Sequence, residues 1–105
     1  MKLSTFFDSE NKWTQKVYAR NASNSIVADN DINAVKWCLM SAIYKLNLNH
    51  HEIETKIRNT PTFKDFEEKF LAENPKLHNA NLVNFNDYRK TNFSVLIKAL
   101  REAGV

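Results

Sequence analysis

The chain is 105 residues long, 43% hydrophobic and 26% charged, with a formal net charge of +3 at pH 7. That length supports one globular domain, residues 1–105, with a real core and no room for a second domain. The single cysteine excludes an internal disulfide, and no apolar run approaches the roughly 18 residues of a membrane-spanning helix. We therefore expect a small soluble, cytoplasmic protein with no membrane role.

The first elements are expected to be short. Leu3, Phe6 and Phe7 indicate a short amphipathic segment that ends in the polar residues 8–11. Residues 13–20 fit either a helix or a strand, and their β-branched and aromatic side chains favour a strand. Residues 21–25 have the composition of a turn, after which residues 26–27 can return as a second strand. The sequence thus predicts a small β-hairpin near the amino end.

Residues 31–46 have the apolar periodicity of a central helix, with Asp29 or Asp31 as its N-cap. One face of this helix would carry the apolar residues Val35, Cys38, Leu39, Ala42, Ile43 and Leu46. The opposite face would carry Trp37, Met40 and Tyr44. A helix with two apolar faces is either enclosed by its own domain or offers the second face to a partner. We expect it to organise the fold.

Three further helical segments are separated by capping residues and prolines. Asn49 is expected to cap one helix, Thr60 or Thr62 starts the next beside Pro61, and Asn74 with Pro75 ends it. Residues 76–90 are mostly polar and predict a long loop or short strand, held to the core by Leu82, Val83 and Phe85. Thr91 is expected to cap the last helix, and Gly104 to end it.

These elements predict a mainly α, α+β fold. We expect a compact bundle of four to five helices around the helix of residues 31–46, with the small hairpin at the amino end. No internal repeat and no low-complexity linker interrupts the chain.

No residue pattern indicates an active site. Cys38 is the only thiol, and its position among apolar residues predicts burial in the core. Adjacent His50 and His51 would point about 100° apart on a helix, which does not suit one metal ion. A single glycine, Gly104, excludes the glycine-rich loops that bind phosphate groups. We expect a non-enzymatic protein with no metal and no cofactor.

Three sequence blocks carry a family resemblance. They are KWTQKVYARNASNSIV, then DINAVKWCLMSAIYK, and NFNDYRKTNFSVLIKALREA at the carboxyl end. In this order they resemble a family of small bacterial or phage proteins of uncharacterised function. The residues that carry the resemblance are Trp13, Thr14, Gln15, Arg20, Trp37, Cys38, Asn86, Asp87 and Thr91. Asn21 and Ser41 depart from the family pattern, which has aspartate and glycine there. The resemblance implies a shared fold, a bacterial host and no known activity.

The leading functional hypothesis is binding to a protein partner. The face of Trp37, Met40 and Tyr44 is the predicted contact surface, provided that it is exposed. Such a protein could be an accessory or inhibitory factor of a phage or another mobile element. A homodimer is the other arrangement of this kind.

Two alternatives come from other classes. Cations interleaved with aromatic residues are typical of nucleic-acid binding. The residues of that hypothesis are Lys12, Lys16, Arg20, Arg89 and Lys90. The charges are spread evenly, however, with six basic and four acidic residues in the first 50 positions, so nucleic acid is the weaker hypothesis. A small enzyme or ligand-binding protein would instead bring Gln15, Arg20, Cys38 and Asp87 around one pocket, with Asp87 able to pair with Arg20.

Overall fold

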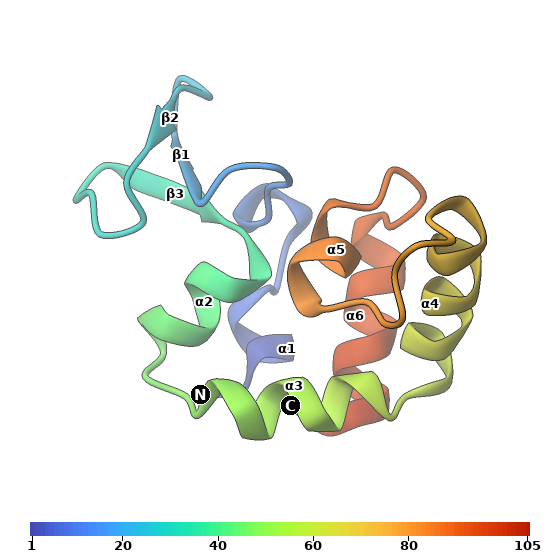
Figure 1. The fold of residues 1–105 in the computed structure, drawn as a ribbon. Helices are drawn as coiled ribbons and strands as arrows, with labels where there is room; N and C mark the ends of the chain where they lie inside the picture. The colour runs from blue at the N-terminus through green and yellow to red at the C-terminus, as the bar shows by residue number, and fades with distance from the viewer.

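The computed structural model describes residues 1–105 and confirms the α+β class: six α-helices, four of them with seven or more residues, and a three-stranded sheet. Figure 1 shows the sheet at one end of the molecule, above a body of helices. The elements in chain order are α1 (Leu3–Phe6), the 3-10 turn η1 (Glu10–Lys12), β1 (Ala19–Asn21), β2 (Ile26–Val27), β3 (Ala34–Trp37), α2 (Leu39–Lys45), α3 (His50–Arg58), α4 (Pro61–Glu73), α5 (Leu82–Asp87) and α6 (Phe93–Ala103).

The predicted hairpin is confirmed and belongs to a sheet with the order β2-β1-β3, antiparallel throughout. The predicted extent of its first strand, residues 13–20, is wrong: β1 covers only Ala19–Asn21, because the Thr14 carbonyl and the Lys16 amide bond to α5 side chains instead of a neighbouring strand. Ala19 stands opposite Val27 on one side and Trp37 on the other. The turn between β1 and β2 is closed by Asn21, whose Oδ1 accepts hydrogen bonds from the Ser23 and Ser25 amides, both 3.0 Å long. An asparagine side chain that bonds the next backbone amides is a common cause of such a turn.

The prediction of one helix over residues 31–46 is wrong. Residues 34–37 form β3, and α2 begins only at Leu39. The N-cap is neither Asp29 nor Asp31 but Cys38, whose Sγ accepts from the Ser41 amide at 3.4 Å. In the sequence, the apolar residues of β3 and α2 together fall at helical spacing, and such a short strand cannot be distinguished from a helical turn by periodicity alone. Val35, predicted in the core, is 41% exposed as a result.

The later helices follow their capping residues. Asn49 and Thr60 are N-caps as predicted, Pro61 occupies the first turn of α4, and Gly104 ends α6 with φ of 73°. Two predictions are wrong here. The segment predicted as loop or strand contains α5, which Asn81 and Asn84 start by bonding each other's backbone amides. The cap of α6 is Asn92 rather than Thr91, because the Asn92 Oδ1 accepts from the Val95 amide at 2.9 Å.

The core lies among the helices. Phe85 of α5 is fully buried, and its ring lies 5.4 Å from that of Phe63 and 5.1 Å from that of Phe66, both in α4. Leu39 and Ile43 of α2 are also fully buried. The chain end is fixed as well, since Val105 is buried and its carbonyl accepts from the Ser4 amide at 3.1 Å. None of these helices combines the length and the apolar character that crossing a lipid bilayer requires.

One surface network predicts a pH effect. Arg89 and then Tyr88 donate hydrogen bonds to the Glu73 carboxylate, and they hold its pKa below the ordinary glutamate value. A carboxyl group whose pKa is lower in the folded than in the unfolded protein stabilises the fold. This contribution is complete at pH values above the pKa of the unfolded state, and it is lost as the pH falls through the pKa of the folded state. We expect Glu73→Gln to reduce the loss of thermal stability between neutral pH and about pH 3.

Thermal unfolding followed by circular dichroism over that pH range measures this effect. Glu68→Gln is the matched control, because Glu68 is an exposed glutamate of the same helix and should keep the wild-type pH profile. An unchanged profile in Glu73→Gln would contradict the assignment.

Candidate functional site

The segment of residues 13–16 is held against α5 by one buried side chain. Asn86 is 1% exposed, and its Oδ1 accepts from the Trp13 indole at 2.7 Å and from the Leu39 amide at 2.9 Å. Its Nδ2 donates to the Thr14 carbonyl at 3.2 Å. A single amide group thereby joins three parts of the chain: the segment before β1, the start of α2, and α5.

Gln15 and Asp87 complete this attachment. The Gln15 Nε2 lies within hydrogen-bond distance of the carbonyl oxygens of Asn86, Tyr88 and Thr91, at 2.9, 3.1 and 3.0 Å. The Asp87 Oδ1 accepts from the Lys16 amide at 2.7 Å. These polar residues from the first and third sequence blocks therefore fix the position of the hairpin on the helical body.

Lys16 adopts a left-handed backbone conformation with φ of 70°, which directs its amide toward Asp87. A side chain with a Cβ is disfavoured there by roughly 1–2 kcal/mol, whereas glycine is not. We expect Lys16→Gly to leave the free energy of unfolding unchanged or to raise it by up to about 1 kcal/mol, as measured by urea denaturation.

Lys64→Gly provides the contrast for this prediction. Lys64 is an exposed residue inside α4. Glycine inside a helix is unfavourable, so Lys64→Gly is expected to lower the free energy of unfolding by about 1 kcal/mol. Destabilisation of both variants by the same amount would show that the conformation at Lys16 carries no strain.

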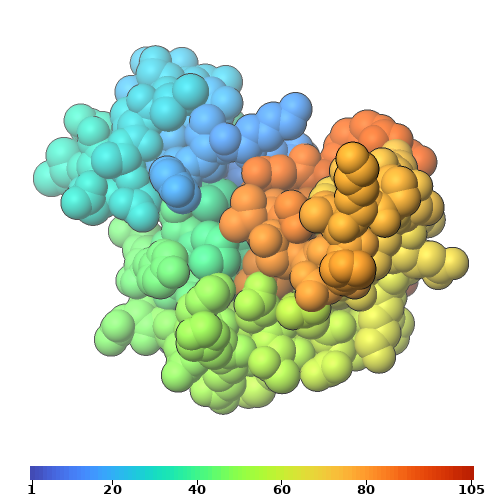
Figure 2. Space-filling model, in the orientation of Figure 1, coloured from blue at the N-terminus to red at the C-terminus, as the bar shows by residue number.

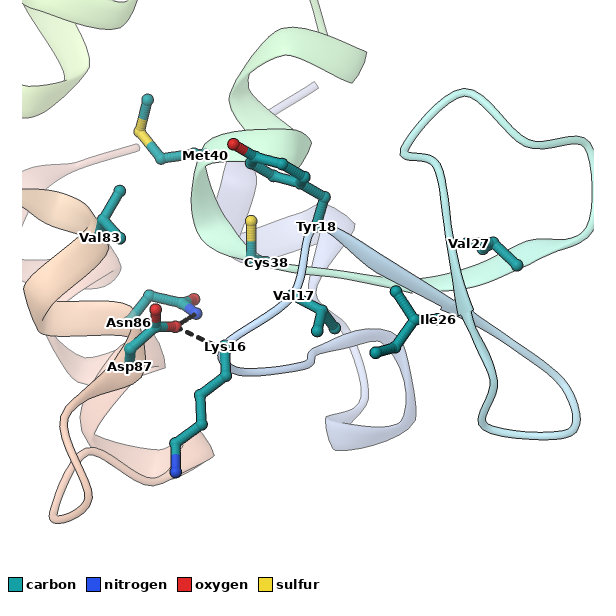
Figure 3. Close-up of a pocket in the computed structure, with 10 residues that line it drawn as sticks. All are labelled: Lys16, Val17, Tyr18, Ile26, Val27, Cys38, Met40, Val83, Asn86 and Asp87. Carbon is teal, nitrogen blue, oxygen red and sulfur yellow. Dashed lines mark hydrogen bonds between the residues drawn. The ribbon is translucent and has the colours of Figure 1, made fainter.

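A groove of about 390 Å³ lies between the hairpin and α5. We call it the hairpin–α5 groove, and its lining residues are Lys16, Val17, Tyr18, Ile26, Val27, Cys38, Met40, Val83, Asn86 and Asp87. Figure 2 shows the N-terminal part of the chain, in blue and cyan, projecting from the helical body beside the orange α5. In Figure 3, Tyr18, Cys38 and Met40 gather on one side and Val83 faces them from α5.

The groove is apolar and open to solvent. Tyr18 is 69% exposed, Ile26 66% and Val83 47%. Asn86 offers no free hydrogen-bonding group because both ends of its amide are already bonded within the protein. Asp87 and Lys16 are the acidic and the basic residue of its lining.

The predicted contact residues do not share one face. Trp37 lies in β3, where its indole donates to the Asp29 carbonyl at 3.2 Å and its ring packs 5.4 Å from that of Phe6. Met40 lines the hairpin–α5 groove. Tyr44 is 60% exposed and lines a separate hollow with Asp29 and Lys45. The structure thus brings only Met40 into the groove.

Most cations of the nucleic-acid hypothesis have partners within the protein. Lys12 pairs with Asp8 at 3.3 Å, and Arg89 pairs with Glu73. The Arg20 guanidinium donates to the Thr14 hydroxyl at 3.1 Å and to the Asn24 carbonyl at 2.9 Å. Lys16 and Lys90 have no ion pair, and Lys90 lines a different hollow, next to α4 and α6.

The predicted ligand pocket is assembled in part. Cys38 and Asp87 line the same groove, while the amide of Gln15 and the guanidinium of Arg20 are bonded to the backbone and to Thr14. The alternative in which Arg20 pairs with Asp87 is not realised, because the Arg20 guanidinium bonds Thr14 and Asn24. Cys38 is 8% exposed and buried as predicted.

Four groove residues were not predicted as site residues: Val17, Ile26, Val27 and Val83. Their signal in the sequence was limited to apolar side chains within the predicted hairpin and loop. Only the packing of the hairpin against α5 makes them neighbours.

The fold and the groove define a small α+β domain in which a β-hairpin is anchored to a helical body and an apolar groove lies between them. The chain belongs to the family described as "Family of unknown function (DUF6197)", whose match covers residues 9–104 and therefore every residue that lines the groove. No curated protein and no solved structure matches the chain.

Proposed function

We propose that this chain is a non-enzymatic binding protein that takes a segment of a protein partner into the hairpin–α5 groove. The observation that carries the proposal is the groove itself, an apolar hollow of about 390 Å³ whose rim exposes Tyr18, Ile26 and Val83. A volume near the lower end of the roughly 300–1,000 Å³ seen for ligand pockets suits one or two apolar side chains. Exposed apolar surface of this kind is favourable to bury against a partner.

Preorganisation supports the same proposal. Asn86 and Asp87 hold residues 13–16 on α5, so the segment that leads into the hairpin wall is attached to the opposite wall before a partner arrives. A wall that is already ordered loses less conformational entropy on binding.

A display library of random short peptides, selected on the immobilised protein, tests this proposal. We expect the selected peptides to bind the wild type and to lose at least tenfold in affinity on Val83→Asn, which places an uncharged polar group inside the groove. Ile32→Asn is the matched control, since Ile32 is 97% exposed and does not line the groove. Equal affinity for wild type and Val83→Asn would contradict the proposal.

We propose further that the protein works in the cytoplasm of a bacterial host, as an accessory or inhibitory factor of a phage or other mobile element. The single free cysteine supports a reducing compartment. The genes beside the coding sequence in its source genome test the second point, and a neighbourhood of ordinary metabolic genes would contradict it.

Nucleic-acid binding is the second candidate, supported by the unpaired Lys16 at the edge of the groove and the exposed ring of Tyr18. A labelled single-stranded oligonucleotide whose affinity falls steeply between low and moderate salt would favour this function over the protein partner.

A further inference from the structure

We infer that the partner segment carries an apolar side chain next to an arginine or lysine, and that Asp87 binds the cation while the groove takes the apolar group. This inference rests on the proposed function and names the chemistry of the partner. It starts from the unequal use of the two Asp87 oxygens.

One oxygen of Asp87 is occupied by the protein and the other is free. Oδ1 accepts from the Lys16 amide at 2.7 Å and from the Asn86 Nδ2 at 2.9 Å. Oδ2 has neither a hydrogen bond nor an ion pair with any residue. The two bonds to Oδ1 fix the carboxylate at the edge of the groove and leave Oδ2 available to a ligand.

No neighbouring cation neutralises this carboxylate. Lys16 contacts Asp87 through its backbone amide and not through its ammonium group. Arg89, two residues further along the chain, pairs with Glu73 instead. Figure 3 shows the Lys16 side chain extending away from Tyr18, Cys38 and Met40. A half-buried carboxylate without a cationic partner therefore borders the apolar lining.

Charge complementarity then selects the occupant. A guanidinium or ammonium group can bond Oδ2 in a charge-assisted hydrogen bond, and an adjacent apolar side chain can contact Met40 and Val83. An acidic segment would place a second negative charge beside Asp87. Since the chain carries a net charge of +3, Asp87 sets local specificity and orientation and does not steer the partner from a distance.

The same peptide selection tests the inference. We expect the selected sequences to carry an apolar residue beside arginine or lysine. Replacing that arginine by uncharged citrulline in a synthetic peptide should weaken binding to the wild type by roughly fivefold to tenfold, and should have no effect on binding to Asp87→Asn. Fluorescence anisotropy measures both affinities.

Two variants and a folding measurement complete the experiment. Asp87→Asn keeps an oxygen that can accept from the Lys16 amide, so its thermal unfolding is expected to stay close to that of the wild type. Lys16→Gln should keep the preference for a basic peptide, because the Lys16 ammonium has no part in it.

Each result distinguishes the inference from the proposed function. If the peptides bind the groove and lose affinity on Val83→Asn, but citrulline has no effect or the selected sequences are acidic, the inference is overturned and the proposed function stands. If no peptide is selected, or if Val83→Asn binds as well as the wild type, both are overturned.

Discussion

Asn86→Ala is expected to destabilise the protein by about 3–5 kcal/mol. The substitution leaves the Trp13 indole, the Leu39 amide and the Thr14 carbonyl without their partner. Leaving a buried polar group without a hydrogen bond costs about 1–3 kcal/mol of folding free energy. Here three such groups depend on one side chain, so their costs arise together. Urea denaturation followed by tryptophan fluorescence and by circular dichroism measures the free energy of unfolding.

The control for this prediction is Asn79→Ala. Asn79 is exposed and makes no side-chain hydrogen bond, so its removal should change stability by less than about 0.5 kcal/mol. A loss below about 1 kcal/mol in Asn86→Ala would mean that the hairpin is held to the helical body by other contacts. That outcome would remove the physical basis for a preformed groove.

Phe85→Ala is the second substitution with a large expected effect, also about 3–5 kcal/mol. Its ring is fully buried and lies within 5.4 Å of the rings of Phe63 and Phe66. Removing it loses the buried apolar area and leaves a cavity that the neighbouring rings fill only in part. The free energy of unfolding in urea gives the size of the loss.

Val83→Ala is the matched control on the same helix. Val83 is 47% exposed and faces the groove, so we expect a change of less than about 0.5 kcal/mol. Similar losses for Phe85→Ala and Val83→Ala would contradict the division of α5 into a core face and a groove face. The pair thus separates the two roles of this helix.

The sequence predicted the elements whose limits are set by local chemistry. The helices after Asn49 and Thr60 begin at side chains that bond the first free amides, and α6 ends at Gly104, which accepts the left-handed conformation. The turn at Asn21 was predicted for the same reason, because its side chain bonds the amides that follow.

The errors arose where tertiary contacts override local preference. Residues 34–37 become a strand because β1 offers them backbone partners and Thr14 bonds the Trp37 carbonyl at 3.1 Å. None of those partners is adjacent in the sequence, and a continuous helix fits the apolar spacing equally well. The short α5 was missed because Asn81 and Asn84 are weak signals in a polar segment.

The candidate site was predictable only in part. The sequence singled out Asn86, Asp87, Cys38 and Met40, all of which line the groove. It did not predict that Tyr18 and Val83 would stand on opposite walls. That relation depends on the docking of residues 13–16 on α5, which involves bonds between positions more than 70 residues apart.

The central claim, that the hairpin–α5 groove binds a partner segment, is tested most directly by nuclear magnetic resonance. A peptide selected on the wild type would be titrated into isotope-labelled protein, and the backbone amide shifts would be followed. We predict that the largest changes fall on residues 16–18, 26–27, 38–40 and 83–87, which surround the groove. Changes centred on Tyr44 and Lys45, with the groove amides unmoved, would contradict the account.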